Sequence, residues 1–263
     1  FPKEYGTGYR SSGGGGSGNF RVKLDDGNLV SGTTAITTTS FSPPANLPEG
    51  SHMLYVQERD IAGNWSLSGN YAILVDTTAP TGAVTINSGT VSTKNATVNL
   101  ALSCSDSGSG CSQMRFSNDN SGWTDWEPFA TGRSFTLSQA DGQKSVFVKY
   151  QDAAGNSSTA VISSIFLDTA PPVTTATPAG GSYGAVKTVN LTCNDTTGTG
   201  CGAIYYSTDG STPSIPYTGP ITISAQTTLK YYSLDLLGNP EPVRTADYSF
   251  IPGYTQLTLE LSK

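Results

Sequence analysis

The stretch Asp152-Ala153-Ala154-Gly155-Asn156 decides the fold, because its pattern D-x-x-G-N occurs three times along the chain. The other two copies are residues 60–64 and 235–239. The first two copies lie 92 residues apart, and the same distance separates residues 76–80 (DTTAP) from residues 168–172 (DTAPP). Self-similarity at a fixed period is the signature of tandem repeats. The sequence therefore predicts a repeated unit of about 90 residues.

A strand is expected before each copy of the motif. Apolar residues stand six and four positions before the aspartates: Leu54 and Val56, Val146 and Val148, Leu229 and Tyr231. This period of two is typical of a half-buried strand. The glycine can take the positive φ of a tight turn, and the Asp and Asn side chains can hydrogen-bond its backbone. A calcium ion is the alternative role for the aspartate, but one carboxylate per turn offers too few ligands. We therefore predict turns and no metal site.

Helical periodicity is missing, since Gly, Pro or β-branched residues interrupt every candidate segment. Short strands at regular spacing predict an all-β fold of three tandem immunoglobulin-like β-sandwich domains, the first incomplete. The expected domains are 1–79, 80–171 and 172–250. A separate C-terminal strand is expected within 251–263.

The composition excludes several kinds of partner. The net charge is −6 and the pI is near 4.7, whereas nucleic acids and anionic membranes attract basic patches. No apolar run approaches the roughly 20 residues of a membrane-spanning helix. The chain begins with Phe1 and no signal-peptide core follows it, so we interpret it as a mature or excised product.

The four cysteines form two local pairs, Cys104 with Cys111 and Cys193 with Cys201. Each pair brackets a loop rich in Gly, Ser, Thr and Asp and occurs once per repeat. We predict two disulfides and an extracellular location, either secreted or at the cell surface. Free thiols and zinc are the less favoured alternatives, because the chain has a single histidine and no C-x-x-C motif.

Two segments resemble known families. Residues 123–129 (WTDWEPF) and 141–148 (DGQKSVFV), followed by the second D-x-x-G-N turn, resemble the bacterial Ig-like repeats of large secreted proteins. Residues 204–213 (IYYSTDGSTP) and 217–221 (YTGPI) resemble the C-terminal β-sandwich module of chitobiases. These resemblances cover residues 20–250 and imply a sandwich fold in an extracellular setting. Such modules serve as spacers, adhesins, filament subunits or carbohydrate-binding appendages, so the fold alone selects no function.

No catalytic set and no cofactor are expected. Acyl transfer needs a base oriented by a third group, but the only histidine, His52, aligns with Lys144 and Thr227 in the other repeats. Glycoside hydrolysis needs two carboxyl groups flanking a cleft, whereas the acidic residues are scattered over turns. We therefore expect that the protein is not an enzyme.

Aromatic residues are the candidates for binding a polysaccharide, because a ring face can stack on the apolar side of a sugar. The candidates are Trp123, Trp126, Tyr205, Tyr206 and Tyr217. The alternative is that these large side chains pack against their own hairpins. Both interpretations stay open.

The two ends of the chain differ from the repeat pattern. A shift of 92 residues aligns Ser12 with Cys104, so the first repeat has eleven residues where the second has the segments 81–92 and 95–103. The first domain is therefore predicted to lack its opening strand. At the other end, residues 255–261 (TQLTLEL) place Leu257, Leu259 and Leu261 on one face of a strand that has no evident sheet.

A missing strand at one end and a surplus strand at the other predict strand donation between copies. The three leucines are expected beside the strand of a neighbouring copy that contains Phe20, Val22 and Leu24. Such a contact joins different surfaces and generates open filaments. The leading hypothesis is a structural subunit of an extracellular fibre or surface layer, whose partners are other copies of itself. The runner-up is a carbohydrate-binding or adhesive appendage, and a tail folded onto its own third domain is the alternative to donation.

Overall fold

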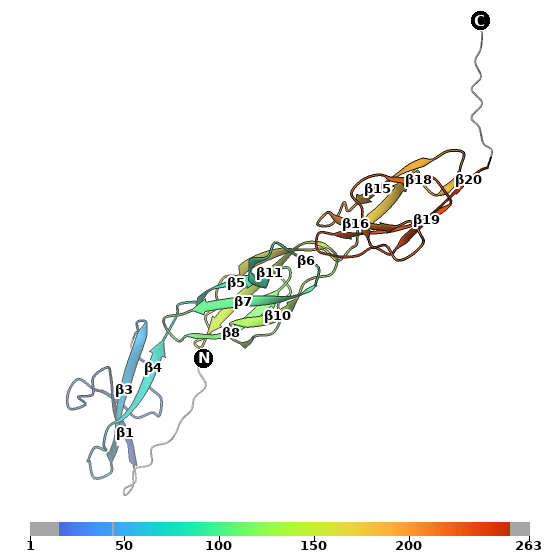
Figure 1. The fold of residues 1–263 in the computed structure, drawn as a ribbon. Coiled ribbons are helices and arrows are strands. Elements are labelled where there is room, and N and C mark those ends of the chain that lie inside the picture. The colour runs from blue at the N-terminus through green and yellow to red at the C-terminus, as the bar shows by residue number, and fades with distance from the viewer. Residues whose placement is uncertain (1–15, 44, 253–263) are drawn as a thin grey trace. The chain divides into compact units, whose positions relative to one another are not determined.

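The computed structural model describes residues 16–43 and 45–252. Over these residues the regular elements are strands, apart from one turn of 3-10 helix at Asn87–Gly89. The strands form three tandem immunoglobulin-like β-sandwich modules, of which the first is incomplete (Figure 1). This confirms the predicted all-β fold. Within the described ranges no helix is long and apolar enough to span a membrane.

The second repeat is a complete sandwich of two sheets. Its small sheet has the order β10 (Gly132–Thr136), β7 (Thr97–Ser105), β5 (Thr81–Ile86). Its large sheet has the order β6 (Ser92–Thr93), β12 (Val161–Leu167), β11 (Gly142–Asp152), β8 (Cys111–Ser117), β9 (Glu127–Pro128). Both sheets contribute apolar residues to the core, including Val98, Leu100, Phe116, Val146 and Val148, all of which are buried.

The third repeat has the same two sheets in the same strand order. The small sheet is β13 (Val173–Thr177), β15 (Lys187–Asn194), β18 (Ile221–Ile223). The large sheet is β14 (Gly181–Tyr183), β20 (Arg244–Phe250), β19 (Thr227–Asp235), β16 (Cys201–Ser207), β17 (Ile215–Pro216). Its core cluster includes Val189, Leu191, Leu229, Tyr231 and Tyr248. The repeat found in the sequence is therefore a repeat of topology.

The first repeat contains one sheet in the part of the chain that the structure describes. Its order is β2 (Thr34–Ile36), β1 (Gly16–Leu24), β3 (Gly50–Asp60), β4 (Gly69–Val75). These strands match β9, β8, β11 and β12 of the second repeat in order. Residues 16–43 and 45–79 include no counterpart of the small sheet or of β6. The predicted loss of an opening strand concerns residues 1–11, which lie outside the described residues.

The three D-x-x-G-N motifs form the predicted turn. In the second repeat, Oδ1 of Asp152 accepts hydrogen bonds from the backbone N–H of Gly155 (2.7 Å) and of Asn156 (2.8 Å). The backbone N–H of Asp152 donates to the Asn156 carbonyl at 3.1 Å. The equivalent glycines all have positive φ, namely 95° at Gly63, 100° at Gly155 and 78° at Gly238. The mechanical role expected for the motif is confirmed.

The chain forms two compact units, and their boundaries differ from those of the three sequence repeats. One compact unit contains the described residues up to Gly82 together with Cys104–Met114 and Tyr150–Thr159. The other contains Ala83–Ser103, Arg115–Lys149 and the described residues from Ala160 onward. The D-x-x-G-N turn of the second repeat thus belongs to the first unit, and that of the third repeat to the second unit.

Gly155→Ala tests the turn directly. A Cβ at this position would meet no atom within 4 Å, so the cost comes from the positive φ alone and should be about 1 to 2 kcal/mol. Urea unfolding followed by circular dichroism, which reports on every repeat, measures this loss. Gly219→Ala is the control, because that site is equally open and needs no positive φ. Equal stability of the two variants would contradict the assigned turn.

Candidate functional site

One face of the first sheet is apolar in its middle, with the polar side chains of His52 and Glu58 toward its two ends. In the antiparallel register of β1 and β3, Val22 lies opposite Val56 and Leu24 lies opposite Leu54. Phe20 points to the same side as Val22 and Leu24, since side chains alternate along a strand. We call this surface the open face, defined by Phe20, Val22, Leu24, Leu54, Val56, Tyr71 and Ile73.

The open face is covered less than the same face in the complete modules. Val22 is buried, but Leu54 and Val56 are half-buried. Their counterparts Val146, Val148 and Leu229 are 0% exposed. The small sheet covers those counterparts, and the described residues of the first repeat include no such sheet. The open face therefore retains apolar surface that the other two repeats bury.

The open face also has a free edge at β4. In the second repeat, β6 pairs in parallel with β12 along that edge, and in the third β14 pairs in parallel with β20. Over residues 16–43 and 45–79, β4 has no such neighbour.

β1 already lies between β2 and β3, so both of its edges are paired. A strand placed beside Phe20, Val22 and Leu24 would therefore cover them from above or enter at β4, rather than hydrogen-bond along β1. The expected donor residues Leu257, Leu259 and Leu261 lie outside the described residues.

The two candidate tryptophans pack against cations of their own sheet. The Arg115 guanidinium lies 5.1 Å from the Trp123 ring centroid and 4.4 Å from that of Trp126. Lys149 Nζ lies 4.9 Å from the Trp123 ring. Arg115 stands between the buried Met114 and Phe116 on β8, so this stack is on the outer face of the sheet. Such cation–π contacts account for the position of both rings.

Tyr205 and Tyr206 are adjacent on β16, so their side chains point to opposite faces of the sheet. Tyr205 stacks on Tyr232 of the neighbouring strand, with ring centroids 5.5 Å apart and ring planes 20° apart. Tyr206 makes an edge contact with Tyr217 at 6.3 Å, and both pack against the core of the third module. Tyr205 therefore lies on the outer face of the sheet, while Tyr206 and Tyr217 pack against the core.

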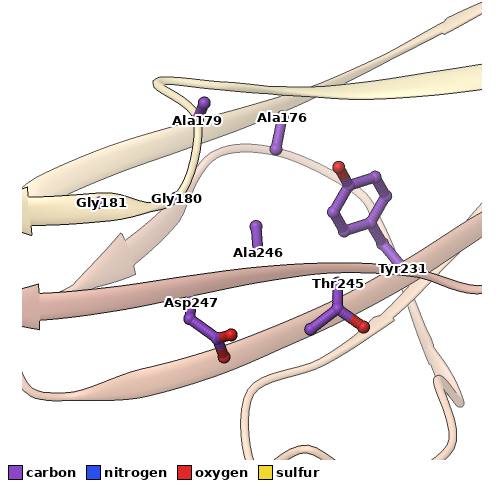
Figure 2. Close-up of a pocket in the computed structure, with 8 residues that line it drawn as sticks. All are labelled: Ala176, Ala179, Gly180, Gly181, Tyr231, Thr245, Ala246 and Asp247. Atoms are coloured by element: carbon purple, nitrogen blue, oxygen red, sulfur yellow. The ribbon is translucent and has the colours of Figure 1, made fainter.

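A pocket in the third module lies where β13 and the segment joining it to β14 face β19 and β20. It is lined by Ala176, Ala179, Gly180, Gly181, Tyr231, Thr245, Ala246 and Asp247. Figure 2 shows the Asp247 side chain pointing away from those of Ala246 and Tyr231. Its Oδ1 accepts a hydrogen bond from the Thr228 hydroxyl at 2.7 Å. The lining thus contains one carboxylate, and glycoside hydrolysis requires two.

Both predicted disulfides are present, Cys104–Cys111 and Cys193–Cys201. Each joins the end of the third strand of its repeat to the start of the next strand. Disulfides form and persist in oxidising compartments. The pairs therefore support the expected extracellular type of protein.

His52 forms an ion pair at the start of β3. Its Nδ1 lies 2.7 Å from Oδ2 of Asp25, and its Nε2 lies 3.0 Å from the Pro48 carbonyl oxygen. The hydrogen bond to Asp25, followed by that to Pro48, raises the pKa of the His52 imidazole. The same pair, with the Met53 N–H, lowers the pKa of the Asp25 carboxyl. These contacts give His52 a structural role in the loop after β1.

Comparison with known proteins finds a family match in the third repeat. A family model described as the chitobiase/beta-hexosaminidase C-terminal domain matches residues 178–245, which confirms the resemblance expected there. Among solved structures, the fibronectin(III)-like modules of Clostridium thermocellum CbhA match with 11% identity and a TM-score of 0.34, over 67% of this chain and 100% of theirs. No curated protein matches.

The histidine pair makes a pH-dependent contribution to stability. Because the folded pKa of His52 is raised, this contribution should be complete below pH of about 6.5 and be lost as the pH rises through the folded pKa. Proton NMR of the single imidazole should give a pKa above 6.5, and Asp25→Asn should bring it back toward that value. An imidazole that titrates identically in both proteins would disprove the pair.

Proposed function

We propose that this chain is a structural subunit of an extracellular fibre or surface layer. In this proposal the segment 255–261 of one copy covers the open face in the first module of the next copy. The observation that carries the proposal is the half-buried state of Leu54 and Val56, whose counterparts in the complete modules are fully buried. An uncovered apolar face beside a free strand edge promotes association.

The donor segment has the pattern that the open face needs. Leu257, Leu259 and Leu261 share one face if residues 255–261 are extended, and Thr258 and Glu260 share the other. Burial of three leucines contributes roughly 5 to 8 kcal/mol before the ordering of the segment is counted. A shift by one residue would bury Glu260 in place of its leucine neighbours, so the register should be unique. Because donor and acceptor surfaces differ, the product is an open filament.

Leu259→Asp should prevent assembly. An unpaired carboxylate on the open face costs several kcal/mol, whereas Thr258→Asp places the same charge on the opposite side of the segment. We expect Leu259→Asp to remain monomeric in sedimentation velocity and to show no filaments in negative-stain microscopy. Thr258→Asp should assemble like the unaltered chain.

A second matched pair tests the acceptor surface. Tyr71 lies on the open face and is 64% exposed, while Leu74 lies on the opposite face of β4 and is 54% exposed. Both sites tolerate a charge in the folded monomer because they are already solvated. Tyr71→Asp should weaken assembly and Leu74→Asp should not. Equal filament formation by all four variants, or a chain that stays monomeric at every concentration, would overturn the proposal.

The match to the chitobiase C-terminal domain favours a second function, a carbohydrate-binding or adhesive appendage. The outward Tyr205–Tyr232 stack offers a flat aromatic surface. Aromatic faces of this kind are the usual platforms for sugar rings.

Tyr205→Ala tests this second function. If the stack binds polysaccharide, the variant should lose retention on insoluble chitin, because half of the platform is removed. Circular dichroism checks that the variant remains folded. Absence of retention by the unaltered chain on chitin, cellulose and peptidoglycan would leave the stack as packing.

A further inference from the structure

Three aspartates from distant parts of the sequence converge where the second repeat ends and the third begins. Asp168 follows β12, Asp195 follows β15 inside the disulfide loop, and Asp235 ends β19 and begins the D-x-x-G-N turn. One carboxylate oxygen from each residue lies within 4.8 Å of the other two. All three belong to the second compact unit.

Asp168 is fully buried and half of its carboxylate lacks a partner. Its Oδ2 accepts hydrogen bonds from the backbone N–H of Thr199 at 2.6 Å and from the Thr199 hydroxyl at 2.7 Å. Its Oδ1 is buried and has no hydrogen-bond partner. A buried carboxylate oxygen normally has a donor or a cation beside it, because desolvation without compensation is costly. The Oδ1 atom is therefore free to bind a cation.

The charges around the cluster are not balanced by basic side chains. Over residues 16–43 and 45–252, none of the ion pairs involves Asp168, Asp195 or Asp235. Lys94 is close, but its Nζ donates to the Gly238 carbonyl at 3.5 Å. The remaining partners of Asp195 and Asp235 are N–H groups, including that of Gly200 at 2.8 Å. Three carboxylates at this separation repel one another unless a cation or protons lie among them.

The same arrangement occurs where the first repeat ends and the second begins. Asp76 follows β4, Asp106 lies in the other disulfide loop, and Asp152 begins the D-x-x-G-N turn. One carboxylate oxygen from each again lies within 4.8 Å of the others. Oδ2 of Asp106 is buried and has no hydrogen-bond partner. An unsatisfied oxygen thus recurs in both clusters, although on a different aspartate.

The disulfide loop approaches both clusters closely. A Cβ at Gly198 would lie 2.5 Å from Oδ1 of Asp195 and 2.7 Å from Oδ2 of Asp168. A Cβ at Gly108 would lie 2.4 Å from the Asp76 carboxyl carbon. Glycine is therefore required where the loop wraps around the carboxylates. The turn asparagines add a further link, since Asn239 Nδ2 donates to the Asp168 carbonyl at 2.9 Å.

We propose that each aspartate cluster binds one calcium ion. The donors are all oxygen, as a hard cation prefers, and carboxylates are the usual ligands of Ca²⁺. Zinc usually binds Cys and His side chains. Here both cysteine pairs are disulfides and His52 is paired with Asp25, so these side chains already have other partners. The sequence argument against calcium counted one carboxylate per turn, and the structure brings three together.

Calcium binding would make stability depend on the ion. Extracellular modules commonly bind calcium with dissociation constants of about 10⁻⁴ to 10⁻³ M. Isothermal titration of the full chain, stripped with chelator, should show two calcium ions per chain in this range. The thermal midpoint should rise with CaCl₂ compared with chelator at equal ionic strength, and less with MgCl₂.

Asparagine substitutions assign each site. Asp168→Asn should leave one calcium ion per chain or weaken one site about tenfold or more, and Asp76→Asn should do the same at the other site. Without calcium, Asp168→Asn should be at least as stable as the unaltered chain, because one repelling charge is gone. Asp195→Asn repeats the test on a less buried ligand, in case Asp168→Asn fails to fold. Asp125→Asn is the control, since that exposed residue removes an equal charge outside both clusters.

The outcomes separate the possibilities. Two bound ions that fall to one in each single variant support the proposal. Unchanged thermal midpoints in calcium and chelator, with no binding heat at millimolar calcium, overturn it. An equal response of Asp125→Asn and Asp168→Asn would show a general charge effect and also overturn it. Filament formation does not enter these measurements, so the calcium sites and the proposed assembly fail or succeed separately.

Discussion

Each large sheet in this chain has one apolar face, and the modules depend on covering that face. In the second repeat the large sheet brings Phe116, Val146 and Val148 into the core, and the small sheet supplies Val98 and Leu100. Each such side chain contributes roughly 1.5 to 3 kcal/mol when it is fully buried. The first sheet has the same face but less cover, so the energetic drive that closes the other modules is only partly satisfied there. The association that we propose through this face rests on that deficit.

A second constraint comes from the aspartates at the ends of the sheets. The D-x-x-G-N turn uses its aspartate as an acceptor for backbone N–H groups, which fixes the turn and explains the asparagine. Two further carboxylates lie near the aspartate of the turn. One belongs to an aspartate in the disulfide loop, and the other to the aspartate that follows the last strand of the preceding repeat. Hydrogen bonds satisfy some of these oxygens, but Asp168 Oδ1 and Asp106 Oδ2 remain without donors. The aspartate of the turn therefore has two roles. It holds the turn backbone through hydrogen bonds, and its charge adds to that of two neighbouring carboxylates.

The aromatic residues show how strand register sorts similar side chains. Tyr205 and Tyr206 are adjacent in sequence, yet one lies in an outer stack and the other packs on the core. Trp123 and Trp126 lie on the outer face but are held by Arg115. A ring that already stacks on a cation of its own sheet presents less free surface to a sugar. Of the aromatic residues considered, Tyr205 and Tyr232 form a half-buried pair of stacked rings on the outer face of their sheet.

The amino-acid sequence by itself determined the all-β class, the repeat length, the D-x-x-G-N turns and both disulfide pairs. These features are local, or recur at a fixed spacing, so that period and residue type are enough to find them. It also indicated that the first repeat is incomplete, because the alignment left too few residues for its opening strand. Only the tertiary structure decided which residues meet across long separations. Asp168, Asp195 and Asp235 each look like an ordinary turn or loop residue in the sequence. Their carboxylates converge because strand order and the disulfide loop bring three separate segments to one point, and single-sequence spacing carries no record of that contact.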